Sequence, residues 1–97
     1  MAWMFDQSPN VACIATATVF AGDPVLVVTH YEDDHSWAFL DGRPINQAQT
    51  WVVAMSQVIE LHPDLQEIAD LPPGWTAWRA SASQPWLKEL DPAEMPA

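Results

Sequence analysis

The sequence predicts a small α+β domain: an antiparallel sheet of about four strands, with one or two short helices packed on one face. Apolar, β-branched segments separated by Gly, Pro and Asp predict the strands. A stretch with apolar residues at helical spacing in the second half predicts the helices. The length of 97 residues suits a single domain with one modest core.

Three of the predicted strands lie in the first half of the chain. Val11–Phe20 is rich in β-branched residues, and Val25–Tyr31 is an almost unbroken apolar run that is typical of a central strand. Ser36–Leu40 follows an acidic turn and ends at Asp41 and Gly42. Because short turns separate these segments, we expect each to pair with the next in an antiparallel meander.

The helices are predicted between the third and fourth strands. Apolar residues at Met55, Val58 and Ile59 have the spacing of one helix face. Pro63 ends that helix and can begin a second one, because its ring fixes φ and it has no N–H to donate. The preceding segment, residues 51–54, is compatible with a short strand or with the lead-in to the helix.

The fourth strand is predicted at Trp75–Ala80, where successive side chains alternate between two faces. Ser, Pro and Ala dominate after it. We therefore expect an N-terminal arm at residues 1–10, a single domain at 11–86 and a frayed C-terminal tail at 87–97.

The chain is strongly acidic, with thirteen Asp and Glu residues against three Lys and Arg and a formal net charge of −10. This charge opposes binding to nucleic acid and to anionic membranes, and it favours basic protein partners. It is equally compatible with a surface that only keeps the protein dispersed. We expect a monomer or a weak homodimer.

One cysteine, Cys13, is present, so no internal disulfide can form, which suits a reducing cytoplasm. It falls within a predicted strand, where a buried thiol acts as an apolar filler. No apolar run approaches the roughly 20 residues that span a bilayer, and no basic start precedes an apolar segment. A cytoplasmic protein is expected.

The densest functional signal is an acidic run that opens onto an aromatic strand. Glu32, Asp33 and Asp34 repel one another, so we expect them at a solvated hairpin tip. Trp37 begins the strand behind them, and Asp41 adds a carboxylate where that strand ends. An acidic loop on a rigid sheet is a candidate partner-binding surface. Its predicted residues are Glu32, Asp33, Asp34, His35, Trp37 and Asp41.

The sequence supports metal binding and catalysis less well than it supports a partner-binding surface. His30 and His35 lie near Asp33 and Asp34, and imidazoles with carboxylates can bind transition metals. No second cluster supplies further ligands, so neither a metal nor another cofactor is expected. The chain has no Gly-rich phosphate loop, Gly-x-Ser-x-Gly motif or paired Cys motif. We do not expect an enzyme.

Two alternatives stay open. Trp51, Trp75 or Trp78 would line an apolar pocket between sheet and helices if the domain binds a small ligand. Arg79, one of the three bases, is expected to form a structural ion pair with a carboxylate such as Asp41 or Asp70, and a ligand contact is the alternative.

Several blocks of the sequence resemble a group of small bacterial proteins. They are Ala-Cys-Ile-Ala-Thr around Cys13, Thr-His ending at His30, Asp-Asp-x-Ser-Trp-x-Phe-Leu-x-Gly starting at Asp33, the helix before Pro63, and Ala-Asp-Leu-Pro-x-Gly-Trp-x-Ala-x-Arg ending at Arg79. Through them the chain, from about residue 11 to residue 86, is similar to the immunity protein 33 family.

The resemblance implies a small α+β domain that protects against a secreted toxin by binding it, without catalysis of its own. Under this interpretation the acidic surface occludes a basic, toxin-like partner. Two positions depart from the pattern. His35 stands where Gly is expected in the acidic turn, and His62 stands before Pro63 where Asp would be a better helix cap.

Overall fold

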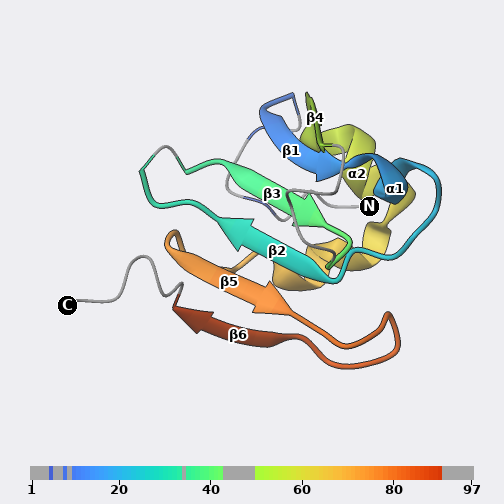
Figure 1. The fold of residues 1–97 in the computed structure, drawn as a ribbon. Coiled ribbons are helices and arrows are strands. Elements are labelled where there is room, and N and C mark those ends of the chain that lie inside the picture. The colour runs from blue at the N-terminus through green and yellow to red at the C-terminus, as the bar shows by residue number, and fades with distance from the viewer. Residues whose placement is uncertain (1–4, 6–7, 9, 34, 43–49, 91–97) are drawn as a thin grey trace.

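The computed structural model describes residues 5, 8, 10–33, 35–42 and 50–90, which form a six-stranded mixed sheet and three short helices (Figure 1). The predicted α+β class is confirmed, and the sheet has more strands than predicted. In chain order the elements are β1 (Ala12–Thr16), α1 (Ala17–Phe20), β2 (Val27–His30), β3 (Trp37–Leu40), β4 (Thr50–Ala54), α2 (Met55–Leu61), the 3₁₀ helix η1 (Pro63–Ile68), β5 (Trp75–Trp78) and β6 (Leu87–Leu90).

The strand order across the sheet is β4-β1-β3-β2-β5-β6. All neighbours are antiparallel except β1 and β3, which run parallel. The predicted hairpin of β2 and β3 is present, with Val28 opposite Phe39. The predicted meander is wrong at its first step, because β3 rather than β2 lies beside β1.

The first strand also ends earlier than predicted. Val11–Phe20 has the composition of one strand, but the chain leaves β1 after Thr16 and turns into α1. The hydroxyl of Thr16 accepts a hydrogen bond from the N–H of Asp41 at 3.0 Å and lies 3.4 Å from the carbonyl of Phe39. This change of direction is therefore held by the end of β3, a distant contact that β-branched composition does not reveal.

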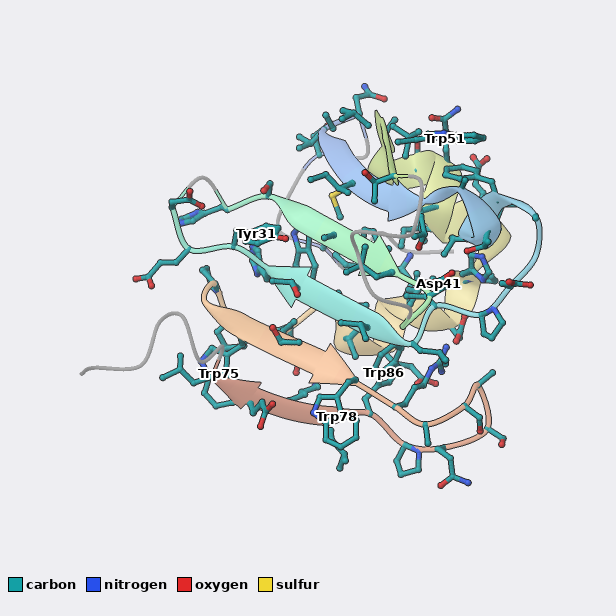
Figure 2. The ribbon with its side chains drawn as sticks, in the orientation of Figure 1. Tyr31, Asp41, Trp51, Trp75, Trp78 and Trp86 are labelled. Carbon is teal, nitrogen blue, oxygen red and sulfur yellow. The ribbon has the colours of Figure 1, made fainter. Side chains whose placement is uncertain are left out.

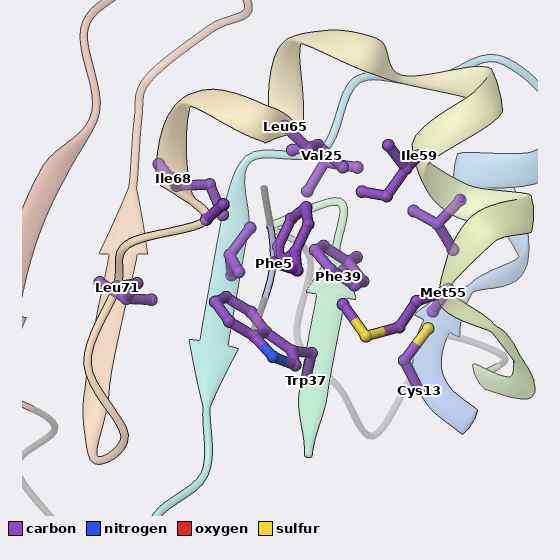
Figure 3. Packing of buried hydrophobic residues seen from close by; sticks show 14 of the residues in the cluster. Phe5, Cys13, Val25, Trp37, Phe39, Met55, Ile59, Leu65, Ile68 and Leu71 are labelled. Atoms are coloured by element: carbon purple, nitrogen blue, oxygen red, sulfur yellow. The ribbon is translucent and has the colours of Figure 1, made fainter. Parts of the chain in front are cut away.

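Helices α2 and η1 cover one face of the sheet and enclose the core, as predicted for the segment before the last strand (Figures 1 and 3). The side chain of Gln57 accepts the N–H of Ala54 at 3.2 Å, which satisfies one donor at the start of α2. Pro63 begins η1. The largest core side chains without exposed surface are Trp37, Phe39, Met55, Leu65 and Ile68. At about 1.5–3 kcal/mol for each buried apolar side chain, this cluster dominates the stability of the fold.

Both terminal regions contribute to the folded domain. Phe5, within the predicted arm, is buried and packs edge-on against Trp37 with ring centroids 4.9 Å apart. Leu87–Leu90, within the predicted tail, forms the edge strand β6. Neither segment has a long apolar pattern of its own, so its order depends on partners far away in the sequence. Residues 1–4, 6–7, 9 and 91–97 lie outside the described residues.

Candidate functional site

The described residues of the acidic run lie at the end of the β2–β3 hairpin, and we call Glu32, Asp33 and His35 the hairpin tip. The N–H of Tyr31 donates to the carbonyl of Ser36 at 2.9 Å and closes the loop. Glu32 and Asp33 are exposed in that loop, whereas Asp34 lies outside the described residues. Two of the three predicted acids therefore lie at a solvated hairpin end.

His35 has a backbone conformation that glycine adopts more readily. Its φ is +58°, and it is the one non-glycine residue with positive φ among the residues described. This left-handed region is sterically unfavourable for a residue that carries a Cβ. The ring of His35 meets that of His30 edge-on, with centroids 6.2 Å apart. The turn therefore keeps a glycine-like shape at the position where the resemblance led us to expect glycine.

Trp37 supports the hairpin tip from inside the domain. It is fully buried and stacks on His30, with ring centroids 3.9 Å apart. His30 Nδ1 donates to the carbonyl of Leu71 at 2.7 Å, and the carbonyl of His30 accepts from the N–H of Gly74 at 2.7 Å. A side chain without exposed surface cannot touch a partner directly, so Trp37 contributes only as the support behind the tip.

Asp41 does not lie with the hairpin tip. Figure 2 shows Tyr31 and Asp41 at opposite ends of the hairpin. Asp41 is buried, its carboxylate accepts a hydrogen bond from the hydroxyl of Thr18, and its N–H donates to Thr16. Its inclusion among the partner-binding residues is corrected: Asp41 joins the end of β3 to β1 and α1. Its position in the sequence, next to Gly42, suggested an exposed turn and gave no sign of these threonines.

The buried side chain of Arg79 forms an ion pair with a carboxylate that is 42% exposed. Its Nη2 donates to Asp64 Oδ2 at 2.9 Å, and its Nε donates to the carbonyl of Val25 at 3.1 Å. A structural ion pair was predicted, with Asp41 or Asp70 as the carboxylate, and Asp64 takes that place. The pair connects β5 to η1 and to the segment that leads into β2.

Lys88 forms the second described ion pair, with Asp70 Oδ1 at 3.1 Å on the surface. Arg43 lies outside the described residues. The guanidinium of Arg79 also lies 4.1 Å from the ring centroid of Trp86. Both described bases are therefore bound away from the hairpin tip, to carboxylates on and beside η1.

The three tryptophans of the alternative pocket do not converge. Trp51 lies at the β4 edge, 49% exposed, with its ring 5.5 Å from that of Phe20. Trp75 and Trp78 are three apart on β5 and point to opposite faces of the sheet. Figure 2 shows Trp51 at the opposite side of the domain from these two. The space between sheet and helices is occupied by core side chains (Figure 3).

Cys13 is enclosed in the core, 2% exposed, and burial raises the pKa of its thiol to about 12. A neutral, enclosed thiol is a poor nucleophile, as its predicted role as apolar filler requires. Across the part of the chain that is described, no three His, Cys, Asp or Glu side chains gather closely enough to hold a metal ion.

The exposed apolar side chains of β4 were not singled out by the sequence. Residues 51–54 were predicted as a possible strand or helix lead-in, with Trp51 as a possible pocket residue, yet Trp51 and Val52 are 49% and 75% exposed. The sequence did contain a signal for this strand, namely a run of β-branched and aromatic residues without a charge. Natural edge strands usually carry charges or prolines, so such a run at the edge of a sheet is unusual.

Comparisons of the chain with protein-family profiles, with curated protein sequences and with solved structures found no match. The resemblance to the immunity protein 33 family therefore stays a prediction from the sequence. Among the described helices, none is long and apolar enough to cross a membrane.

Proposed function

We propose that this protein is an immunity-type interaction protein, which neutralises a basic, toxin-like protein by occluding it with the hairpin tip. The observation that carries the proposal is the exposure of Glu32 and Asp33 on a loop whose base is buried and closed by a backbone hydrogen bond. His35 belongs to the same surface and Trp37 supports it from inside the domain, while Asp41 is not part of it.

The rigidity of the hairpin favours recognition over a flexible acidic loop. The hydrogen bond between Tyr31 and Ser36 closes the loop, and the stack of Trp37 on His30 holds both strands below it. Residues that are ordered before binding lose less conformational entropy on association. A preorganised acidic loop can therefore bind a basic groove with little rearrangement.

The charge distribution supports the same proposal. The described bases, Arg79 and Lys88, are bound to Asp64 and Asp70, so their charge is partly neutralised by carboxylates outside the tip. With a net charge of −10, the whole chain attracts a basic protein, and the tip presents part of that charge at an accessible point. Such complementarity accelerates encounter and disfavours acidic partners more than it adds affinity.

The test compares two double charge reversals with the wild-type protein. The tip variant carries Glu32→Lys and Asp33→Lys, and the matched control carries Glu60→Lys and Glu67→Lys, which reverse two exposed acids on α2 and η1. Each immobilised protein is incubated with native host lysate, and retained proteins are quantified by mass spectrometry alongside products of neighbouring genes.

We expect a basic protein that the wild type and the control retain and that the tip variant loses at least about tenfold, equivalent to about 1.4 kcal/mol. Melting temperatures of all three should agree within a few degrees, because the changed side chains are exposed. Equal retention by both variants would contradict a role for the tip. If the tip variant and the control variant lose the basic protein equally, net charge alone attracts it.

A further inference from the structure

The two edges of the sheet, β4 and β6, differ in chemistry. Strand β6 carries Lys88 and Glu89 and follows Pro85, and such charges and prolines protect an open edge from pairing with another strand. Strand β4 has the sequence Thr-Trp-Val-Val-Ala, without a charge, a proline or a glycine. One edge is therefore protected, and the other has the composition of a strand that pairs.

The backbone of β4 has groups that face outward. The N–H of Met55 donates to the carbonyl of Val11 at 2.9 Å and extends the antiparallel ladder between β1 and β4. Because backbone groups in a ladder alternate between the two sides of a strand, those of odd-numbered residues in β4 face β1. The N–H and carbonyl groups of Thr50 and Val52 consequently point to the open edge.

The end of β4 limits how long a new ladder can be. The N–H of Ala54 also faces outward, and it donates to the side chain of Gln57 at 3.2 Å. Its carbonyl, at the N-cap of α2, accepts the first hydrogen bond within that helix. The open edge thus offers the donors and acceptors of Thr50 and Val52.

The side chains of the edge are apolar and exposed. Val52 is 75% exposed on the face of the sheet opposite the helices, and Trp51 is 49% exposed on the face that carries the helices. Tryptophan is enriched among residues that dominate interfaces, and cross-strand pairs of aromatic and β-branched residues stabilise sheets.

We propose that β4 pairs with β4 of a second copy of this chain, in an antiparallel arrangement with Val52 on the two-fold axis. The two copies of Val52 exchange backbone hydrogen bonds, and the ladder ends beside Ala54, where α2 begins. Trp51 then lies opposite Val53 of the other copy. The result is a continuous sheet across the dimer.

Charge favours a second copy over a basic partner at this edge. In a chain with net charge −10, two copies repel at most surfaces, but β4 places no charged residue against its own copy. A basic partner would find no carboxylate on the strand. The two-fold contact is also closed, and the charged β6 edge prevents further copies from adding at the other side.

The interface is short, so the dimer is expected to be weak, in the class of interfaces below about 1,200 Å². Sedimentation velocity from about 10 µM to about 1 mM should show a concentration-dependent shift from the 10.8 kDa monomer towards twice that mass. A wild-type protein that stays monomeric throughout this range would overturn the proposal.

The Val52→Lys variant tests the register, because it places two like charges beside each other on the axis. It should remain monomeric with an unchanged melting temperature, since Val52 is exposed in the monomer. The matched control, Leu87→Lys, makes the same change at an exposed position of β6 and should dimerise like the wild type. Dimerisation of Val52→Lys at wild-type strength would place the interface elsewhere.

A Val52→Cys variant gives a positive signal. The Cα atoms of a hydrogen-bonded antiparallel pair are about 5.5 Å apart, within the range of about 4.4–6.8 Å that a disulfide spans. Mild oxidation should therefore cross-link this variant into a covalent dimer. The wild type should not cross-link, because Cys13 is enclosed. Absence of the cross-linked dimer at concentrations where the wild type associates would contradict the proposed axis.

Discussion

At the scale of single residues, Cys13 and Arg79 are both enclosed by the fold and are accommodated in different ways. Arg79 donates hydrogen bonds to Asp64, to the carbonyl of Val25 and to the carbonyl of Ala82. Cys13 has no such partner among the described contacts, and its burial favours the neutral thiol. A buried charge requires bonded partners, whereas a buried thiol only needs to stay protonated.

We expect Cys13 to make the free energy of unfolding fall as the pH rises above 9.0. Its pKa is about 12 in the folded protein, against an ordinary value of 9.0. Below pH 9.0 both states hold the proton, so the stabilising contribution is complete. Between pH 9.0 and 12 the unfolded thiol ionises first, which favours unfolding by up to about 1.4 kcal/mol per pH unit.

Urea unfolding at pH values from about 7 to about 11 measures this dependence. The Cys13→Ala variant is the control for all other groups that titrate in the same pH range. Above pH 9.0, the free energy of unfolding of the Cys13→Ala variant should fall less steeply than that of the wild type. Parallel curves for the two proteins would show that Cys13 does not contribute.

At the scale of elements, the β2–β3 hairpin combines a stable base with an unfavourable backbone at its tip. The buried stack of Trp37 and His30 compensates for the positive φ of His35. Gly22, after α1, has a φ of +106° with open space around its missing Cβ. Substitutions at these two positions test how much a positive φ costs in free energy of unfolding. Replacing His35 by glycine removes that cost, and replacing Gly22 by alanine introduces it.

The His35→Gly variant should raise the free energy of unfolding by up to about 1 kcal/mol, because glycine removes the steric penalty of the left-handed conformation. The loss of the ring contact with His30 reduces this gain. Gly22→Ala should lower the free energy of unfolding by about 1 kcal/mol or more, since alanine must adopt a positive φ. Urea unfolding measures both variants, and a destabilised His35→Gly protein would show that the ring contact outweighs the backbone penalty.

At the scale of the whole molecule, the net charge of −10 acts on stability as well as on partners. Like charges lie closer together in the compact state than in the unfolded chain, so their repulsion opposes folding. Only two ion pairs, Arg79 with Asp64 and Lys88 with Asp70, offset this repulsion within the described residues. Exposed pairs such as the second contribute little.

We therefore expect salt to stabilise the protein. Raising NaCl from about 20 mM to about 500 mM shortens the Debye length from about 20 Å to about 4 Å. The melting temperature should rise by several degrees, equivalent to about 1 kcal/mol. The variant with Glu60→Lys and Glu67→Lys has a net charge of −6, from −10 plus two for each reversal, and should respond less. An equal response would indicate a general salt effect and no role for self-repulsion.

The local parts of the fold were predictable because their signals lie within a few residues. The acidic run followed by alternating aromatic residues predicted the β2–β3 hairpin, and apolar spacing with Pro63 predicted α2 and the helix after it. Of the site, the exposure of Glu32 and Asp33 followed from charge repulsion alone.

The parts of the fold that the sequence did not predict depend on contacts between segments that are distant in the chain and meet across the sheet. The parallel pairing of β1 with β3 and the burial of Asp41 require Thr16 and Thr18 to reach the end of β3. The ordering of Phe5 requires Trp37. No spacing within these segments indicates such partners, because a strand has two edges and composition does not say which neighbour occupies each.

The sequence by itself determined that this chain is a small, acidic α+β domain with a solvated acidic hairpin tip, because charge repulsion and apolar periodicity act over short distances. Only the tertiary structure decided which carboxylates are exposed, which strands are neighbours and which sheet edge is left uncharged and open. These depend on how distant segments share one core, and the free energy of that burial belongs to the assembled domain.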